Sequence, residues 1–99
     1  MGKENYLKAL DLLYKEAIAI YGRQNQMNIA IEEMAELTKE ICKNKRGFDN
    51  RNNIIEEMAD VYIMLEQLEI IFDIDISEII KMKEFKLNRL ADRLDRRSL

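Results

Sequence analysis

The sequence predicts an all-α protein, and three observations lead to that expectation. The chain of 99 residues has no proline and only three glycines, so few positions interrupt a helix. Apolar residues recur at intervals of three and four residues over most of its length, which is the period of an amphipathic helix. Helix-starting patterns separate the apolar segments. We therefore expect one domain of four helices over residues 1–99.

The composition fits a folded cytoplasmic domain. Apolar residues make up 47% of the chain and charged residues 35%, so a core is possible and disorder is not expected. The formal charge of −3 gives no general attraction to polymeric nucleic acid or to membranes. No apolar run is long enough to span a bilayer, and no signal-peptide pattern opens the chain. The single cysteine, Cys42, fits a reducing compartment and is expected to be a packing residue.

The absence of histidine narrows the chemistry most. A Ser-His or Cys-His nucleophile is excluded, and so is a structural zinc site of cysteine and histidine. Di-iron bundles need a Glu-x-x-His motif, which is also missing. A catalyst built from this chain has carboxylates, Lys, Arg, amides and a bound metal to work with.

Two helices are expected in the first half of the chain. The first covers residues 3 to 21 and ends at Gly22, because glycine takes the left-handed turn beyond a helix at little cost. The second runs from about Asn25 to Asn44, with Asn25 or Asn28 as N-cap. The predicted core stripe of this second helix is Met27, Ala30, Ile31, Met34, Leu37, Ile41 and Cys42. Glu33, Glu36 and Glu40 cluster opposite that stripe, as on a solvated face.

Residues 43 to 53 form the one substantial loop. Gly47 marks its turn, and Lys45, Arg46 and Arg51 make it basic. Contact with phosphates is possible, but an exposed polar connection is the favoured interpretation. Phe48 either stacks on a base or holds the loop against the core, and we expect the second.

The third helix is expected to start at Asn53, which forms a capping box with Glu56, and to reach about Phe72. Its broad apolar face consists of Ile54, Met58, Val61, Leu65, Leu68 and Phe72. Further apolar residues lie around the rest of its circumference, which is typical of a helix buried on more than one side. A chain this short cannot cover such a helix alone. We therefore expect an oligomer, a homodimer or homotetramer, with this helix near the interface and its acids in a partly desolvated groove.

The fourth helix is expected from Ile76 to about Arg96, after a capping box of Asp75 and Glu78. Its apolar stripe is Ile76, Ile80, Leu87, Leu90 and Leu94. Lys86, Arg89, Arg93 and Arg96 share a basic face.

Paired acidic turns on the second and third helices are the candidate metal ligands. Glu33 with Glu36, and Glu57 with Asp60, are neighbours on one helix face, so each pair can present two carboxylates to one point. Two such pairs repel each other unless a cation lies between them. Hard oxygen ligands select Mg²⁺, or Mn²⁺, rather than zinc. A metal held there would leave water as the attacking group, since the chain offers no side-chain nucleophile. The alternative is that these acids are solvated faces.

The chain resembles the all-alpha nucleoside triphosphate pyrophosphohydrolases, the MazG-like superfamily. Their signature is an ExxE turn and an ExxD turn on successive helices, matched by Glu33-x-x-Glu36 and Glu57-x-x-Asp60. The segments NQMNIAIEEMAEL, EEMADVYIMLEQL and KEFKLNRL are similar to the short, single-module members of phages and Gram-positive bacteria. The resemblance covers roughly residues 20 to 95.

This resemblance implies an antiparallel four-helix MazG-like bundle assembled as an oligomer. It also implies Mg²⁺-dependent hydrolysis of (deoxy)nucleoside triphosphates to the monophosphate and pyrophosphate, in nucleotide-pool house-cleaning. Glu33, Glu36, Glu57 and Asp60 would hold the metal, and one of them would orient the water.

Substrate-binding residues follow from the same resemblance. Lys83 occupies the place of the phosphate-binding lysine of the fourth helix, with Lys86 and Arg89 next in line. Relatives often carry an asparagine four residues after that lysine, where this chain has Leu87. Gln26, seven residues before Glu33, is a candidate for a base contact.

Two alternatives remain at this stage. Within the same superfamily, the substrate could instead be phosphoribosyl-ATP or dUTP. Outside it, the chain could be a non-catalytic helical oligomerisation module whose acids keep it soluble.

Overall fold

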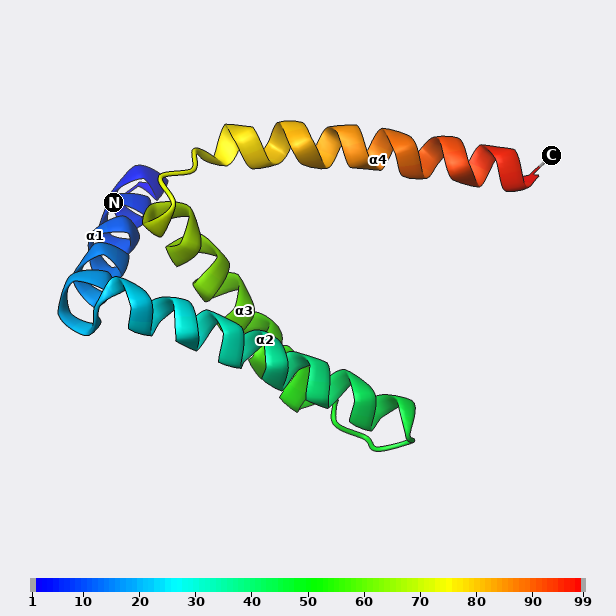
Figure 1. Ribbon diagram of the computed structural model, residues 1–99, viewed down its shortest axis with the longest axis horizontal. Coiled ribbons are helices and arrows are strands. Elements are labelled where there is room, and N and C mark those ends of the chain that lie inside the picture. Colours follow the sequence, from blue (N-terminus) through cyan, green and yellow to red (C-terminus); the bar gives the residue numbers. More distant parts are fainter. Residues whose placement is uncertain (1, 99) are drawn as a thin grey trace.

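The computed structural model describes residues 2–98, with side chains described for residues 2–96. In this range the chain forms α1 (Lys3–Tyr21), α2 (Arg23–Lys45), α3 (Arg51–Ile71) and α4 (Ile76–Ser98), and no strand (Figure 1). The all-α class with four helices is confirmed. None of these helices is long and apolar enough to cross a membrane.

Helices α2 and α3 form a long hairpin, and α1 packs at its open end (Figure 1). α2 and α3 run in opposite directions along this hairpin. Gln26 near the start of α2 contacts Gln67 near the end of α3, and Glu40 near the end of α2 contacts Asn50 just before α3. α4 leads away from this hairpin, and every described side chain on it is exposed. The expected bundle is therefore not closed within one chain.

The α2 and α3 helices end in the same backbone motif. After α2, the Phe48 N–H donates to the Lys43 carbonyl and the Gly47 N–H donates to the Asn44 carbonyl. After α3, the Ile74 N–H donates to the Glu69 carbonyl and the Asp73 N–H to the Ile70 carbonyl. These are Schellman motifs, whose first residue beyond the cap takes a left-handed conformation. That residue is Gly47 at φ 99° after α2 and Asp73 at φ 52° after α3.

The predicted stop at Gly22 (φ 93°) is confirmed, but two predicted N-caps are wrong. α2 starts at Arg23, directly after Gly22, and has no side-chain cap bond at Asn25 or Asn28. Gly22 ends α1 and directly precedes α2.

The other wrong N-cap is Asn53, because α3 starts at Arg51 and Asn50 precedes it. The capping box before α4 is confirmed: the Asp75 N–H donates to Glu78 Oε2 and the Ser77 N–H to Asp75 Oδ1, each at 2.9 Å.

The core of a single chain is small. Tyr14, Ala30 and Met64 are the buried apolar residues in the described range. Much of the predicted apolar surface is exposed instead: Ile31 keeps 64% of its surface, and Cys42 is exposed rather than packed. The contact of α2 with α3 is largely polar, since it buries Gln26, Glu40, Asn50 and Gln67. Ala30 of the predicted α2 stripe is buried as well, but much of both apolar stripes is only half-buried or exposed.

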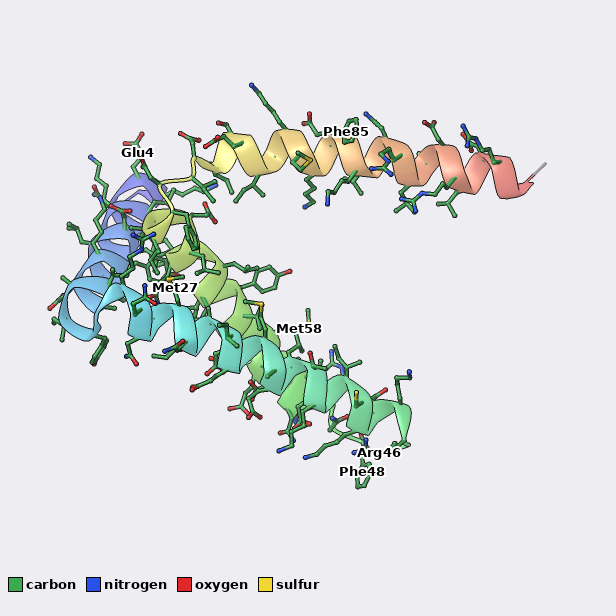
Figure 2. The ribbon with its side chains drawn as sticks, in the orientation of Figure 1. Glu4, Met27, Arg46, Phe48, Met58 and Phe85 are labelled. Atoms are coloured by element: carbon green, nitrogen blue, oxygen red, sulfur yellow. The ribbon has the colours of Figure 1, made fainter. Side chains whose placement is uncertain are left out.

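The turn of the basic loop is exposed at Phe48. Phe48 is 59% exposed, with the Arg46 guanidinium 6.0 Å from its ring centroid (Figure 2). The expectation that Phe48 holds the loop against the core is therefore wrong. The backbone motif around Gly47 shapes this turn without an apolar anchor.

Candidate metal centre

Three of the four predicted ligands converge between α2 and α3. Glu33 on α2, and Glu57 and Asp60 one turn apart on α3, each offer a carboxylate oxygen within 4.8 Å of the others. Glu33 and Glu57 are half-buried. The acids on α2 were predicted to lie opposite its core stripe, as on a solvated face. The seam instead includes Ala30 of that stripe, which is 1% exposed, together with Glu33, so Glu33 faces α3 rather than open water.

Repulsion among the carboxylates of this cluster favours the binding of a cation between them. Burial raises the pKa of Glu33 above its usual value, and the charge of Asp60 and a hydrogen bond shared with Asp60 raise it further. Burial also raises the pKa of Glu57, followed by the charges of Asp60 and Glu36. Glu57 Oε2 is a buried oxygen without a hydrogen-bond partner. An orphaned carboxylate oxygen among like charges is what a cation would satisfy.

Glu36 lies beside the cluster but outside the group of three. Its side chain is exposed, and its charge contributes to the raised pKa of both Glu33 and Glu57. Of the four ligands predicted from the ExxE and ExxD turns, Glu33, Glu57 and Asp60 therefore converge, and Glu36 is a nearby acid.

Hydrogen bonds hold the seam on both sides of the acidic cluster. Toward the loop, the Asn50 side-chain amide donates to the Glu40 backbone carbonyl at 2.8 Å and to Glu40 Oε2 at 2.9 Å. Glu40 is 8% exposed, so its predicted place on a solvated face is wrong. The sequence gives no signal for this contact, because asparagine before a helix is ordinarily read as a cap.

Toward α1, Gln26 Nε2 donates to Gln67 Oε1 at 2.8 Å. Gln26 is 4% exposed and its own Oε1 has no hydrogen-bond partner. The predicted base-contact residue thus lies inside the same seam as the acids, one heptad from Glu33. Gln67, which orients it, was not predicted.

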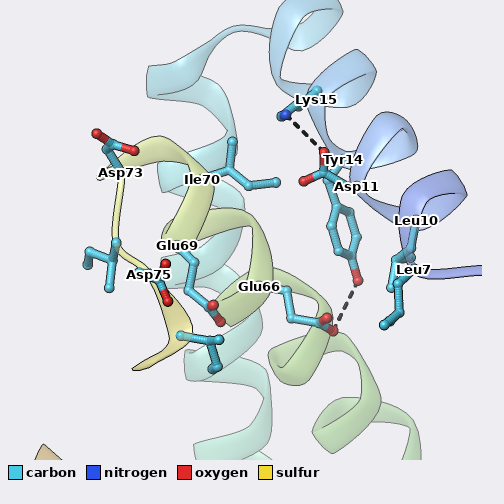
Figure 3. A pocket seen from close by; sticks show the side chains of 12 residues that line it. Leu7, Leu10, Asp11, Tyr14, Lys15, Glu66, Glu69, Ile70, Asp73 and Asp75 are labelled. Atoms are coloured by element: carbon cyan, nitrogen blue, oxygen red, sulfur yellow. Dashed lines mark hydrogen bonds and ion pairs between the residues drawn. The ribbon is translucent and has the colours of Figure 1, made fainter. Parts of the chain in front are cut away.

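A second acidic hollow lies where α1 meets the end of α3 (Figure 3). The Tyr14 hydroxyl donates to Glu66 Oε1 at 3.1 Å, and burial together with the Glu66 charge raises the pKa of Tyr14 to about 12. Burial, then the charges of Glu66 and Asp75, raises the pKa of Glu69. None of the predicted site residues lines this hollow.

The predicted phosphate-binding residues are not brought to the acids within one chain. Lys83 and Lys86 line a shallow groove on α4, and Arg89 lies over the Phe85 ring at 5.7 Å. Figure 2 shows Phe85 on α4 well separated from Met58, the residue next to Glu57 on α3. The chain therefore presents anions and cations on two separate surfaces.

Comparison with protein-family models gave no matching family. Comparisons with curated proteins and with solved structures gave no match either.

Proposed function

We propose that this chain is a divalent-metal-dependent nucleoside triphosphate pyrophosphohydrolase. It would release the monophosphate and pyrophosphate, with water as the nucleophile. The observation that carries the proposal is the convergence of Glu33, Glu57 and Asp60, with the buried Glu57 Oε2 unpartnered. The resemblance of the two acidic turns to the MazG-like signature supports it from the sequence side.

The donor set fits Mg²⁺, and Mn²⁺ as its substitute, because all the convergent atoms are carboxylate oxygens. Glu33, Glu57 and Asp60 would hold the ion, with Glu36 close enough to take part. Bound there, the metal would neutralise phosphate charge and lower the pKa of a water.

Other roles in the reaction are proposed for residues of the chain itself. One of the acids Glu33, Glu36, Glu57 and Asp60 would also orient the attacking water. Gln26, which donates a hydrogen bond to Gln67, is proposed to contact the nucleotide base. Because Gln26 is buried, this contact requires α2 and α3 to separate locally. Lys83, Lys86 and Arg89 are proposed to bind the phosphates.

The fold and setting of the enzyme are part of the proposal. A homodimer or homotetramer would complete the antiparallel bundle, because so many large apolar side chains of one chain are exposed. The cytoplasm is the proposed location, since the single, exposed Cys42 fits a reducing compartment. Phosphoribosyl-ATP and dUTP remain alternative substrates. The exposed apolar surface also favours the rival account of a helical oligomerisation module without activity.

Pyrophosphate release across the eight common nucleoside triphosphates tests the proposal, with Mg²⁺, Mn²⁺ or EDTA present. We expect turnover of at least one nucleotide that needs the metal. Glu57→Gln should abolish it, while Lys45→Ala, in the exposed loop, should leave it nearly unchanged. Absence of cleavage with every metal, or equal activity in both variants, contradicts the proposal.

A further inference from the structure

Three polar residues of α2 face α3 at intervals of seven residues. They are Gln26, Glu33 and Glu40. Between them in the same seam lie Ala30, which is 1% exposed, and Leu37, which is half-buried. These steps of four and three residues are the spacing of a coiled-coil seam, whose positions are ordinarily apolar. In α2, every second position of the seam is polar instead.

The three polar residues differ in what they meet. Gln26 donates to Gln67 at 2.8 Å, and Glu40 accepts from Asn50 at 2.9 Å. Glu33, which lies between them, meets the two other carboxylates of the acidic cluster instead. A hydrogen-bonded pair therefore lies on each side of a repulsive cluster, one heptad or about 10 Å along α2 in either direction.

Repulsion within the cluster favours a separation or rotation of α2 against α3. The connection of residues 46–50 and the Asn50 side chain hold the two helices at one end. At the open end of the hairpin, the bond between Gln26 and Gln67 joins them. The apolar contacts of the seam have no preferred direction, whereas a hydrogen bond requires a particular distance and angle. The amide pair thus has a property that the apolar contacts lack.

The amide pair brings little stability for the polar groups that it buries. Gln26 and Gln67 are 4% and 6% exposed, and Gln26 Oε1 has no hydrogen-bond partner. Two apolar side chains of similar size would leave no polar atom unpaired and would be about as stable. A polar pair in a coiled-coil seam selects one register of the helices at a cost in stability. This role accounts for two buried amides beside the acidic cluster.

We propose that Gln26 and Gln67 are positioning residues, whose bond fixes the register and rotation of α2 against α3 and thereby the convergence of the acidic cluster. Neither side chain supplies a carboxylate, so both act through the placement of the helices. Their effect on metal binding rests on the proposed function, whereas their effect on helix placement does not.

Spin-label distances in the metal-free chain test the helix placement. The labels are attached at Asn28→Cys of α2 and Ala59→Cys of α3, two exposed positions, in a Cys42→Ser background diluted with unlabelled chain. We expect one narrow distance distribution. The double variant Gln26→Leu with Gln67→Leu should give a shifted or broader one, because its apolar pair has no preferred direction. An unchanged narrow distribution in the double variant overturns the proposal.

Gln24→Leu is the matched control, because Gln24 is an exposed glutamine of the same helix. It should leave the distance distribution unchanged, and a shift in this control would contradict the proposal. Urea unfolding should give the control and the double variant free energies close to that of the wild type. If the double variant is instead strongly destabilised, the amide bond supports the whole fold rather than its register, and the proposal fails.

Mn²⁺ binding in the absence of nucleotide measures the consequence for the acidic cluster. The double variant removes no charge and no carboxylate, yet it should bind Mn²⁺ about tenfold or more weakly than the wild type, while Gln24→Leu should not. Equal binding by the double variant and the wild type contradicts the positioning role. If the wild type binds no Mn²⁺ but the distances change as expected, the role in helix placement holds and the proposed function fails.

Discussion

Glu33 of α2 and Asp60 of α3 bring carboxylate oxygens within 4.8 Å of each other across the seam between the two helices. Burial raises the pKa of Glu33, and the charge of Asp60 raises it further. Two carboxylates this close repel each other unless one of them carries a proton or a cation lies between them. The contact therefore makes the seam sensitive to protons, and a metal ion would compete with the proton for the same oxygens.

Without divalent metal, the thermal midpoint should rise as the pH falls from 7 toward 5. The folded-state pKa values of Glu33 and Glu57 are raised, so in the window above their ordinary pKa the folded chain binds more protons than the unfolded chain. The stabilisation is complete below the ordinary pKa and is lost as the pH rises through the raised one. Glu57→Gln should raise the midpoint at pH 7 and flatten this dependence, whereas Glu32→Gln, an exposed neighbour, should not.

Asn50→Ala should destabilise the hairpin by about 1–3 kcal/mol, because it leaves buried polar groups of Glu40 unpaired. Asn53→Ala is the control, since Asn53 is exposed and α3 starts before it. Urea unfolding measures both. A larger loss for Asn53 would mean that the predicted cap, and not the observed contact, holds the start of α3.

The amide pair of Gln26 and Gln67 should show strong coupling. Gln67→Leu leaves the Gln26 amide buried without a partner, at a cost of about 1–3 kcal/mol. The double variant with Gln26→Leu should recover most of that loss, because no buried polar group is then left unpaired. A double-mutant cycle in denaturant measures the coupling, and strictly additive losses would show that the two amides do not pair.

Asp73→Gly should raise the unfolding free energy by about 0.5–1 kcal/mol. Asp73 takes φ 52°, a conformation that glycine adopts without the steric cost of a Cβ. Asp73→Ala keeps the Cβ and should bring no gain. If both substitutions change the unfolding free energy equally, the change comes from loss of the Asp73 carboxylate and not from the backbone conformation.

Local patterns allowed much of the fold to be predicted. Helix period and the absence of proline indicated all four helices, and Gly22 and the pair of Asp75 and Glu78 marked their true boundaries. Asn53 and Asn25 failed as caps because α3 and α2 begin earlier, directly after Asn50 and Gly22. The side chain of Asn50 bonds to Glu40 of α2, a tertiary contact that no local pattern indicates.

The orientation of α2 was predicted only in part. Ala30 of its predicted apolar stripe is buried and Met27 and Leu37 are half-buried, but the other members of the stripe are exposed, and Glu33 and Glu40 face α3. Hydrophobic period identifies a stripe but not which partner covers it, and here one chain does not cover it. The spacing of the two acidic turns, together with the resemblance that they carry, predicted that Glu33, Glu36, Glu57 and Asp60 converge. Glu36 lies outside the group of three because the rotation of α2 about its own axis depends on its packing against α3, which no local pattern encodes.

Binding of Mn²⁺, followed by electron paramagnetic resonance in the absence of nucleotide, tests most directly whether these carboxylates hold a shared ion. We expect saturable binding by the wild-type chain that is displaced by Mg²⁺. This binding should be lost in Glu57→Gln and retained in Glu32→Gln. Failure to find saturable Mn²⁺ binding, or equal binding by both variants, would contradict the metal centre between α2 and α3.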